Sequence, residues 1–263
     1  MSTAFRFMNC PYIHSKCILN YSRSMLFKKK LLDTTLDMKD NEIKAHRLIL
    51  AYKCNYIHQF LEKTWKEILS ISSDMVFRDA VISVDVSCEK EIVDLIINYL
   101  YTGTIIITES NACKLYQCCK IFELNSLEKL TISNIINFID DQNALEYLGR
   151  DISDNVNNAA LGYLCNNFQR ITSTKEFLEC SLTTLEKLID EDDIKTRKEI
   201  DIFESVVRWL EFSVDTRKIY SNQVFSHIRF CLMSTDELIQ AYDIGKIFFD
   251  DKSNLDFLVE AAW

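Results

Sequence analysis

Residue types that bind metals occur in this chain, but their spacing does not complete a known site. Cys10, His14 and Cys17 are spaced as zinc ligands could be, yet no second ligand pair follows at a standard distance. The run Asp190-Glu191-Asp192-Asp193 could hold a cation, although such runs are far more often a solvated turn and helix start. The 10 cysteines show no secretory framework spacing, so small buried thiols are expected. We therefore expect no metal site.

Catalytic motifs are missing as well. Phosphate-binding loops need several glycines close together, because backbone N–H groups must converge on the phosphate, and the 4 glycines of this chain all stand alone. The sequence has no G-x-S-x-G motif, and none of its 4 histidines lies in a recognisable nucleophile setting. We expect a protein with no catalytic residues and no cofactor.

Charge and hydropathy limit the kinds of partner. Residues 1–138 carry 17 basic and 15 acidic side chains, a net charge of +2, whereas residues 139–263 carry 13 and 24, a net charge of −11. The acidic half would repel a phosphate backbone, so nucleic acid is not an expected partner. No apolar run is long enough to span a bilayer, and the N-terminus lacks a signal-peptide layout. We expect a cytoplasmic protein without a membrane partner.

The first half of the chain mixes two periodicities. The spacing predicts helices from Ser15 to Phe27, over 89–101, from Thr108 to Phe122 and from Asn125 to about Ile139. Alternating residues predict strands around 36–38 and 43–45, a third strand through Ile82, Val84 and Val86, and a short one at 105–107. Gly103 is placed to end the second of these helices.

The second half contains no convincing strand. Helices are predicted from Gln142, Ser153, Thr174, Thr183, Glu199, Asn222 and Ser234. Strands followed by helices indicate an α+β domain and then an all-α domain, so the chain is predominantly helical. We place an N-terminal lead at 1–14, the first domain at 15–139 and the second at 140–263.

These segments resemble a known family. Asp33, His46-Arg47-Leu48-Ile49-Leu50 and Tyr99-Leu100-Tyr101-Thr102-Gly103 are similar to the signature of BTB (POZ) domains. Val206-Val207-Arg208-Trp209 and Ile228-Arg229-Phe230-Cys231-Leu232 are similar to the BACK domain of Kelch-like proteins, with Cys231 in place of the usual proline. The resemblance covers about residues 15–263. It implies a BTB/POZ domain followed by a BACK domain.

The resemblance implies two surfaces. Similar BTB proteins form homodimers through their first helix and first strand. The dimer residues implied here are Ile18, Leu19, Leu26 and Leu36, beside a charged pair formed by Asp33 and Arg47. For Ile18 and Leu19, ordinary core packing is the alternative.

The second implied surface binds the N-terminal region of cullin-3. The family's adaptors use an aromatic-rich helix followed by a hydrophobic-x-glutamate motif, together with an aromatic from a later helix. The implied cullin-binding residues are Tyr56, Phe60, Leu61, Trp65, Glu67 and Phe122. Ile57 stands where an aromatic is common, and tryptophan is unusual at position 65. Alternatively, Trp65 packs under its own loop and Glu67 is solvated.

The resemblance therefore implies a homodimeric, non-catalytic adaptor of a RING ubiquitin ligase, with an unknown substrate protein. Two alternatives are a competitive binder that occupies cullin-3 and a BTB scaffold without cullin contact. A Kelch propeller would be expected after Trp263, so we expect the chain to end before it. Few glycines and prolines with 30 isoleucines suggest an AT-rich genome, and a poxvirus is the expected source, acting in the host cytoplasm.

Overall fold

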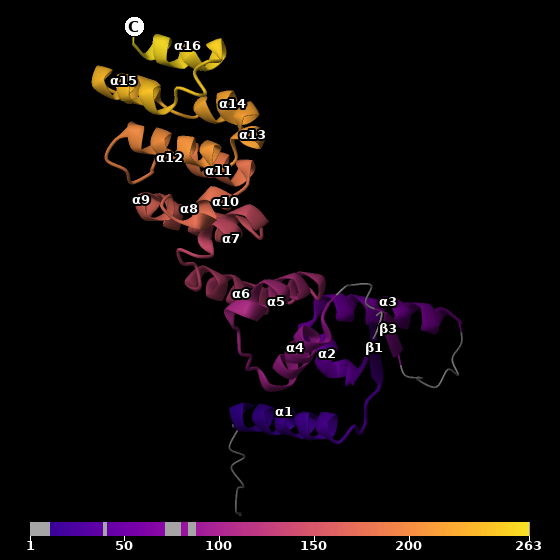
Figure 1. The fold of residues 1–263 in the computed structure, drawn as a ribbon. Helices are drawn as coiled ribbons and strands as arrows, with labels where there is room; N and C mark the ends of the chain where they lie inside the picture. Colours follow the sequence, from indigo (N-terminus) through magenta and orange to yellow (C-terminus); the bar gives the residue numbers. More distant parts are fainter. Residues whose placement is uncertain (1–10, 39–40, 72–79, 84–87, 263) are drawn as a thin grey trace, which may run out of the picture. The chain divides into compact units, whose positions relative to one another are not determined.

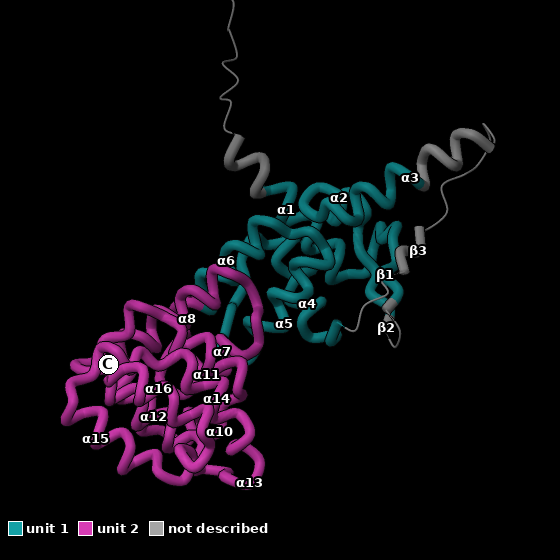
Figure 2. Tube along the Cα trace, turned by 90° about the horizontal axis from the view of Figure 1, so that it is seen from above, with its two compact units in different colours: residues 1–135 teal, residues 136–263 magenta. Residues whose placement is uncertain are grey.

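The chain divides into two compact units, residues 1–135 and 136–263, which Figure 2 colours separately. The computed structural model describes residues 11–38, 41–71, 80–83 and 88–262, with the backbone alone at 11–16, 38, 41, 64–71 and 80–83. None of the helices in these ranges is both long and apolar enough to cross a membrane. In the sequence, the boundary between the two units lies four residues before the one expected at 139/140.

The first unit contains a three-stranded sheet with β1 (Thr34–Met38) in the middle. β2 (Asn41–Ala45) pairs with β1 as an antiparallel hairpin, and β3 (Ala80–Ser83) pairs with β1 in parallel. The parallel pairing requires a crossover, which the chain makes through α2 and α3 between β2 and β3 (Figure 1). Val84 and Val86, which belong to the predicted third strand, lie outside the described residues.

In the part of this unit that the structure describes, six helices accompany the sheet: α1 (Pro11–Phe27), α2 (Arg47–Lys53), α3 (Asn55–Ile71), α4 (Lys90–Thr102), α5 (Glu109–Ile121) and α6 (Asn125–Asn137). The apolar stripe of α4 is buried as its helical spacing predicts, with Val93 and Ile96 almost inaccessible. Gly103 ends α4 at φ 71°, a left-handed conformation that glycine adopts without strain. The core also contains Leu36, Leu50, Ile57, Leu115 and Leu127.

Two expectations for the first unit were wrong. Residues 105–107 are not a strand; their neighbourhood forms hydrogen bonds to side chains, with Asn111 Nδ2 donating to the Ile106 carbonyl at 3.2 Å. β-Branched residues favour a strand only where a neighbouring strand supplies partners. In addition, α1 begins at Pro11, four residues before the helix start predicted at Ser15. Proline is favoured in the first turn, where its missing N–H has no helical partner.

The second unit is entirely helical in its described residues. Its α-helices are α7 (Ala144–Arg150), α8 (Asp154–Asn166), α9 (Phe168–Ile171), α10 (Lys175–Glu179), α11 (Leu182–Ile189), α12 (Glu199–Glu211), α13 (Val214–Arg217), α14 (Ser221–Phe225), α15 (Thr235–Ile244) and α16 (Lys252–Ala261). Two 3₁₀ helices, η1 (Lys218–Tyr220) and η2 (Phe230–Leu232), flank α14. Within this unit the helices stack largely in chain order (Figure 1).

An aromatic cluster forms the centre of the later helices. Phe203 of α12 lies 5.3 Å from Phe225, 5.7 Å from Phe230 and 6.0 Å from Phe249, measured between ring centroids. Gly245, at the end of α15, packs directly against this cluster. A Cβ at this position would lie 2.9 Å from Phe203 and 2.7 Å from Phe249. The approach of the rings therefore depends on a residue without a side chain.

Candidate protein-docking site

The two tyrosines near the end of α4 have different roles. Tyr101 is buried, and its hydroxyl lies 2.8 Å from the backbone nitrogen of His46 and 2.6 Å from Nδ1 of the same residue. Burial raises the pKa of Tyr101 to about 12. Tyr99 is half-buried, with Lys53 Nζ 5.3 Å from its ring centroid. Tyr101 therefore joins α4 to the start of α2, whereas Tyr99 lies beside Lys53 of α2 and is partly exposed to solvent.

His46 extends this connection to the turn after α1. Its Nε2 lies 3.1 Å from the Lys30 carbonyl oxygen, which can only accept, so Nε2 carries the hydrogen and Nδ1 accepts from the Tyr101 hydroxyl. Lys29 and Leu31 on either side of Lys30 have positive φ values of 52° and 57°. Such conformations are costly for these residues, so the hydrogen bond from His46 stabilises a strained turn.

Asp33 and Arg47 are joined by two hydrogen bonds, each between a side chain of one residue and a backbone atom of the other. Asp33 Oδ1 accepts from the Arg47 backbone N–H at 2.7 Å, and Arg47 Nη2 donates to the Asp33 carbonyl at 3.0 Å. The side chain of His46, at the N-cap position of α2, makes no capping bond because its ring is engaged by Tyr101. Asp33 thus supplies the carboxylate that the start of α2 needs. The role of this pair at an interface stays a prediction.

The start of α3 is tied to the junction between α5 and α6. The Cys54 thiol donates to the Phe122 carbonyl at 2.9 Å, and burial raises the pKa of this thiol to about 11. One turn into α3, Gln59 Nε2 contacts Glu123 Oε2 at 3.4 Å. Glu123 adopts φ 52°, which turns the chain sharply between the two helices. These contacts place α3 beside the junction.

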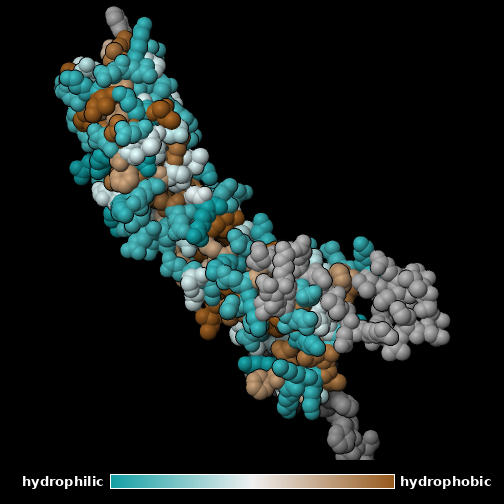
Figure 3. Space-filling view, turned by 45° about the vertical axis from the view of Figure 1, so that its right-hand side comes forward, coloured by the Kyte–Doolittle hydropathy of each residue, from teal (hydrophilic) through white to brown (hydrophobic). Residues whose placement is uncertain are grey.

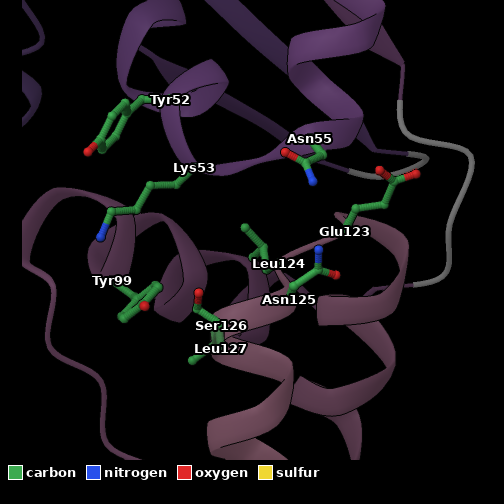
Figure 4. A pocket seen from close by; sticks show the side chains of 9 residues that line it. All are labelled: Tyr52, Lys53, Asn55, Tyr99, Glu123, Leu124, Asn125, Ser126 and Leu127. Atoms are coloured by element: carbon green, nitrogen blue, oxygen red, sulfur yellow. The ribbon is translucent and has the colours of Figure 1, made fainter.

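A shallow cavity of about 350 Å³ opens at this junction (Figure 4). Its lining residues are Tyr52, Lys53, Asn55, Tyr99, Glu123, Leu124, Asn125, Ser126 and Leu127. The Lys53 side chain extends toward Tyr99 at one end, while Glu123 lies at the other end near Asn55 (Figure 4). The cavity is lined by charges of both signs, from Lys53 and Glu123, and by the buried leucines Leu124 and Leu127. Such a lining suits a protein side chain better than a simple ion.

In the second unit, two carboxylates of the acidic run at 190–193 contact neighbouring side chains. His227 Nδ1 lies 3.0 Å from Asp190 Oδ1, and Arg229 Nη2 lies 2.7 Å from Asp192 Oδ1. The run follows α11 as a turn and does not itself begin a helix. Among the residues that the structure describes, no group of three or more His, Cys, Asp or Glu is arranged to hold a metal.

Trp209, from the second-half motif, is a buried anchor. Its Nε1 donates to the Cys180 carbonyl at 3.1 Å, and the Arg217 guanidinium lies 3.9 Å from its ring centroid. Arg217 also donates to the carbonyls of Leu178 and Trp209, at 2.8 and 2.6 Å. The motif therefore holds α10, α12 and α13 together.

Comparison with known proteins agrees with both halves of this architecture. Residues 23–138 match the family model of the BTB/POZ domain, and residues 152–243 match that of BACK, "BTB And C-terminal Kelch". The chain is a BTB domain followed by a BACK domain. The BTB sheet and its helices form the first unit, and the BACK helices form the second.

Similar proteins include members of the Kelch-like group. The human Kelch repeat and BTB domain-containing protein 8 is 26% identical over 84% of this chain. The human Kelch-like protein 28 is 23% identical over 99%, and the mouse Kelch-like protein 17 is 24% identical over 88%. The chain spans 36%, 44% and 35% of the length of these three relatives.

The six residues proposed for cullin binding differ in accessibility. Tyr56, Phe60 and Leu61 are half-buried on α3 and pack against the BTB core. Phe122 is 3% exposed, so its side chain can shape the junction but is not itself presented at the surface. α3 continues through Ile71, which places Trp65 and Glu67 within the helix and not after it; their side chains lie outside the described residues.

The residues proposed for dimerisation also divide by exposure. On α1, Ile18 is 51% exposed and Leu19 is 37% exposed, whereas Leu26 packs against the core. Leu36 is fully buried inside the BTB domain, and its place in a dimer interface stays a prediction. Hydrophobic side chains are visible at the α1 end of the BTB domain, among hydrophilic ones (Figure 3).

Sequence reasoning missed several exposed apolar residues on this domain. Phe27 at the end of α1 is 90% exposed, Leu31 in the following turn 72%, and Leu48 on α2 78%. Leu48 entered the sequence analysis only as part of the motif His46-Arg47-Leu48-Ile49-Leu50. Nothing in the sequence alone distinguishes an apolar residue that faces its own core from one that faces a partner.

Proposed function

We propose that this chain is a non-catalytic adaptor that docks the N-terminal region of cullin-3 on its BTB domain. The observation that carries the proposal is the pairing of α3 with the α5–α6 junction through Cys54, Gln59 and Glu123. Gln59, the neighbour of Phe60 on α3, thereby contacts the exposed carboxylate of Glu123, which also lines the cavity, while Tyr56 and Phe60 are half-buried on the same helix. Aromatic anchors next to one directed charge are the composition of interface hot spots.

The test is the affinity of the purified chain for the cullin-3 N-terminal region, measured by isothermal titration calorimetry. We expect binding that Phe60→Ala weakens about tenfold or more, a loss of at least about 1.4 kcal/mol. The double variant Trp65→Ala with Glu67→Ala is expected to abolish it. Ile219→Ala, at a 76% exposed apolar residue of the BACK domain, is the matched control and should leave the affinity unchanged. Absent binding, or binding that ignores the double variant, rejects the adaptor proposal.

We further propose that the BTB domain forms a homodimer through the apolar surface of α1. The exposure of Ile18 and Phe27 supports this, because exposed apolar side chains gathered on one helix are costly in water. Sedimentation equilibrium should give twice the chain mass. Phe27→Asp should give the monomer mass, and Ile219→Asp should keep the dimer. A wild-type monomer at micromolar concentration would reject this part.

The adaptor and the competitive binder differ in their effect on ubiquitin transfer. In a reconstituted cullin-3 ligase, an adaptor promotes ubiquitination of a captured protein that depends on this chain. A competitor binds cullin-3 equally well and instead suppresses ubiquitination by a second BTB adaptor. Binding energy in both cases serves only to bring components together.

A poxvirus source acting in host cytoplasm is part of the proposal. The 30 isoleucines, 20 lysines and 17 asparagines against 4 glycines and 1 proline support an AT-rich gene. Sequencing the gene and its neighbours tests the source, and imaging the tagged chain in infected cells tests the location. A GC-rich coding sequence would contradict the first expectation.

A further inference from the structure

Two thiols of the BTB domain are in direct contact. Cys118 Sγ lies 2.6 Å from Cys88 Sγ, although the two residues are 30 positions apart in the sequence. Cys88 directly precedes Glu89, the N-cap residue of α4, and Cys118 lies on α5. A disulfide bond is about 2.05 Å long, so bond formation requires only a small approach of the two sulfurs.

A second contact holds the same two segments in register. Lys114 Nζ lies 2.7 Å from Glu89 Oε1 and 2.9 Å from Glu89 Oε2. Lys114 lies one helical turn before Cys118 on α5, and Glu89 directly follows Cys88. The ion pair and the thiol pair therefore connect the same two segments, although an ion pair exposed to this degree contributes little energy.

The two thiols differ in accessibility. Cys88 is half-buried, whereas Cys118 is 3% exposed. Burial, together with the neighbouring Cys88, raises the pKa of Cys118 far above its usual range. Cys88 is thus the thiol that a small oxidant reaches first, and Cys118 is the thiol held in place behind it.

We propose that Cys88 and Cys118 are a peroxide-responsive modification site that forms a reversible intramolecular disulfide. The Cys88 thiolate attacks one oxygen of hydrogen peroxide and breaks the O–O bond; the departing hydroxide takes up a proton, leaving a sulfenic acid and water. The Cys118 sulfur then attacks the Cys88 sulfur, the S–O bond breaks, and a second water leaves. Two thiols are oxidised by two electrons, and one peroxide is reduced to two waters.

The disulfide would close a loop that contains all of α4. Cross-linking the start of α4 to α5 restricts the unfolded chain, so the oxidised BTB domain melts at a higher temperature than the reduced one. The cross-link also fixes the helix that ends at the α5–α6 junction. This inference stands independently of cullin binding.

The experiment uses the full chain, reduced, desalted and exposed to a small excess of hydrogen peroxide. Intact mass spectrometry should show a loss of about 2 Da, and non-reducing peptide mapping should find residue 88 linked to residue 118. Dithiothreitol should restore the original mass. Cys88→Ser and Cys118→Ser should each abolish the linked peptide, whereas Cys113→Ser, one turn away on α5, should keep it.

Two results would overturn the inference. One is a linkage that joins Cys118 to Cys113 or Cys119 in preference to Cys88. The other is oxidation of Cys88 to a sulfinic acid with no linked peptide. If Cys118→Ser does not fold, Cys88→Ser at the half-buried position and the melting temperatures of the reduced and oxidised wild type provide the same decision. An unchanged melting temperature in a sample that carries the linkage would reject the stabilising effect.

Discussion

Tyr101 and His46 are joined by two hydrogen bonds across 55 residues of sequence, at 2.8 Å to the backbone nitrogen and 2.6 Å to the ring. A third bond from the same imidazole reaches the Lys30 carbonyl. One hydroxyl thereby connects the end of α4, the start of α2 and the turn after α1. A polar network of this kind is stabilising only while every member keeps its partner.

Tyr101→Phe should destabilise the BTB domain by about 1–3 kcal/mol, because it leaves the part-buried His46 backbone N–H without its acceptor. Urea unfolding followed by far-UV circular dichroism measures the change. Tyr99→Phe is the matched control, because Tyr99 is half-buried, and should cost less than about 0.5 kcal/mol. Equal effects of the two substitutions would contradict the role given to the Tyr101 hydroxyl.

Stability should fall at alkaline pH. Burial raises the pKa of Cys54 from 9.0 to about 11 and that of Tyr101 from 10.0 to about 12. Because the folded-state pKa values exceed the unfolded ones, the stabilisation is complete below about pH 9 and is lost as the pH rises through 11 and 12. Melting temperatures between pH 8 and 12 would test this. In Tyr101→Phe the decline above pH 10 should be shallower, and an identical slope would count against the assignment.

The start of α15 should weaken in acid. Lys198 Nζ lies 2.6 Å from Glu237 Oε1, and the Ser234 N–H donates to Glu237 Oε2 at 2.8 Å. The lysine, followed by Ser234, lowers the pKa of Glu237 from 4.5 to about 2. Its contribution is therefore present above about pH 4.5 and lost as the pH falls toward 2.

Glu237→Gln should accordingly reduce stability at pH 7 and leave it nearly unchanged at pH 2. Thermal unfolding at both pH values measures the difference. Glu211→Gln, at an exposed glutamate at the end of α12, serves as the control and should change neither value. A Glu237→Gln effect of equal size at both pH values would argue for lost packing and not for lost charge.

Two glycines of the BACK domain should respond to alanine in opposite directions. Gly245→Ala places a methyl group 2.7 Å and 2.9 Å from the buried Phe249 and Phe203 rings, and should cost about 1–3 kcal/mol. Gly162→Ala, inside α8 with nothing within 4 Å, should stabilise by about 0.5–1 kcal/mol. Chemical denaturation of both variants decides the matter, and the same sign in both would refute the steric argument.

Local signals in the sequence predicted the described helices best where a cap was present. Gly103, Thr108, Ser153 and Ser234 mark helix ends that the structure confirms, because capping is satisfied within a few residues. The α16 helix was missed, although Asp251 accepts from the Ser253 N–H at its start. The strand predicted at 105–107 is absent, because a strand needs a neighbouring strand to pair with. That neighbour comes from a distant part of the sequence, which periodicity does not reveal.

The candidate docking site was only partly visible from the sequence. The resemblance selected Phe60 and Phe122, but the Phe122 side chain is buried in the hydrophobic core, and its carbonyl accepts from the Cys54 thiol, a contact over 68 positions. The different roles of Tyr99 and Tyr101 likewise depend on His46. Sequence patterns predict which face of a helix is apolar, whereas the identity of the group packed against that face is a property of the fold.

The order of the sheet has a consequence for synthesis on the ribosome. β1 lies in the middle, yet its parallel neighbour β3 is made about forty residues later, after α2 and α3. While the chain emerges, one edge of β1 stays open to any other extended segment, and the apolar residues of α1 are already outside the tunnel. Slowing translation between residues 38 and 83 should therefore raise the aggregated fraction of the nascent protein.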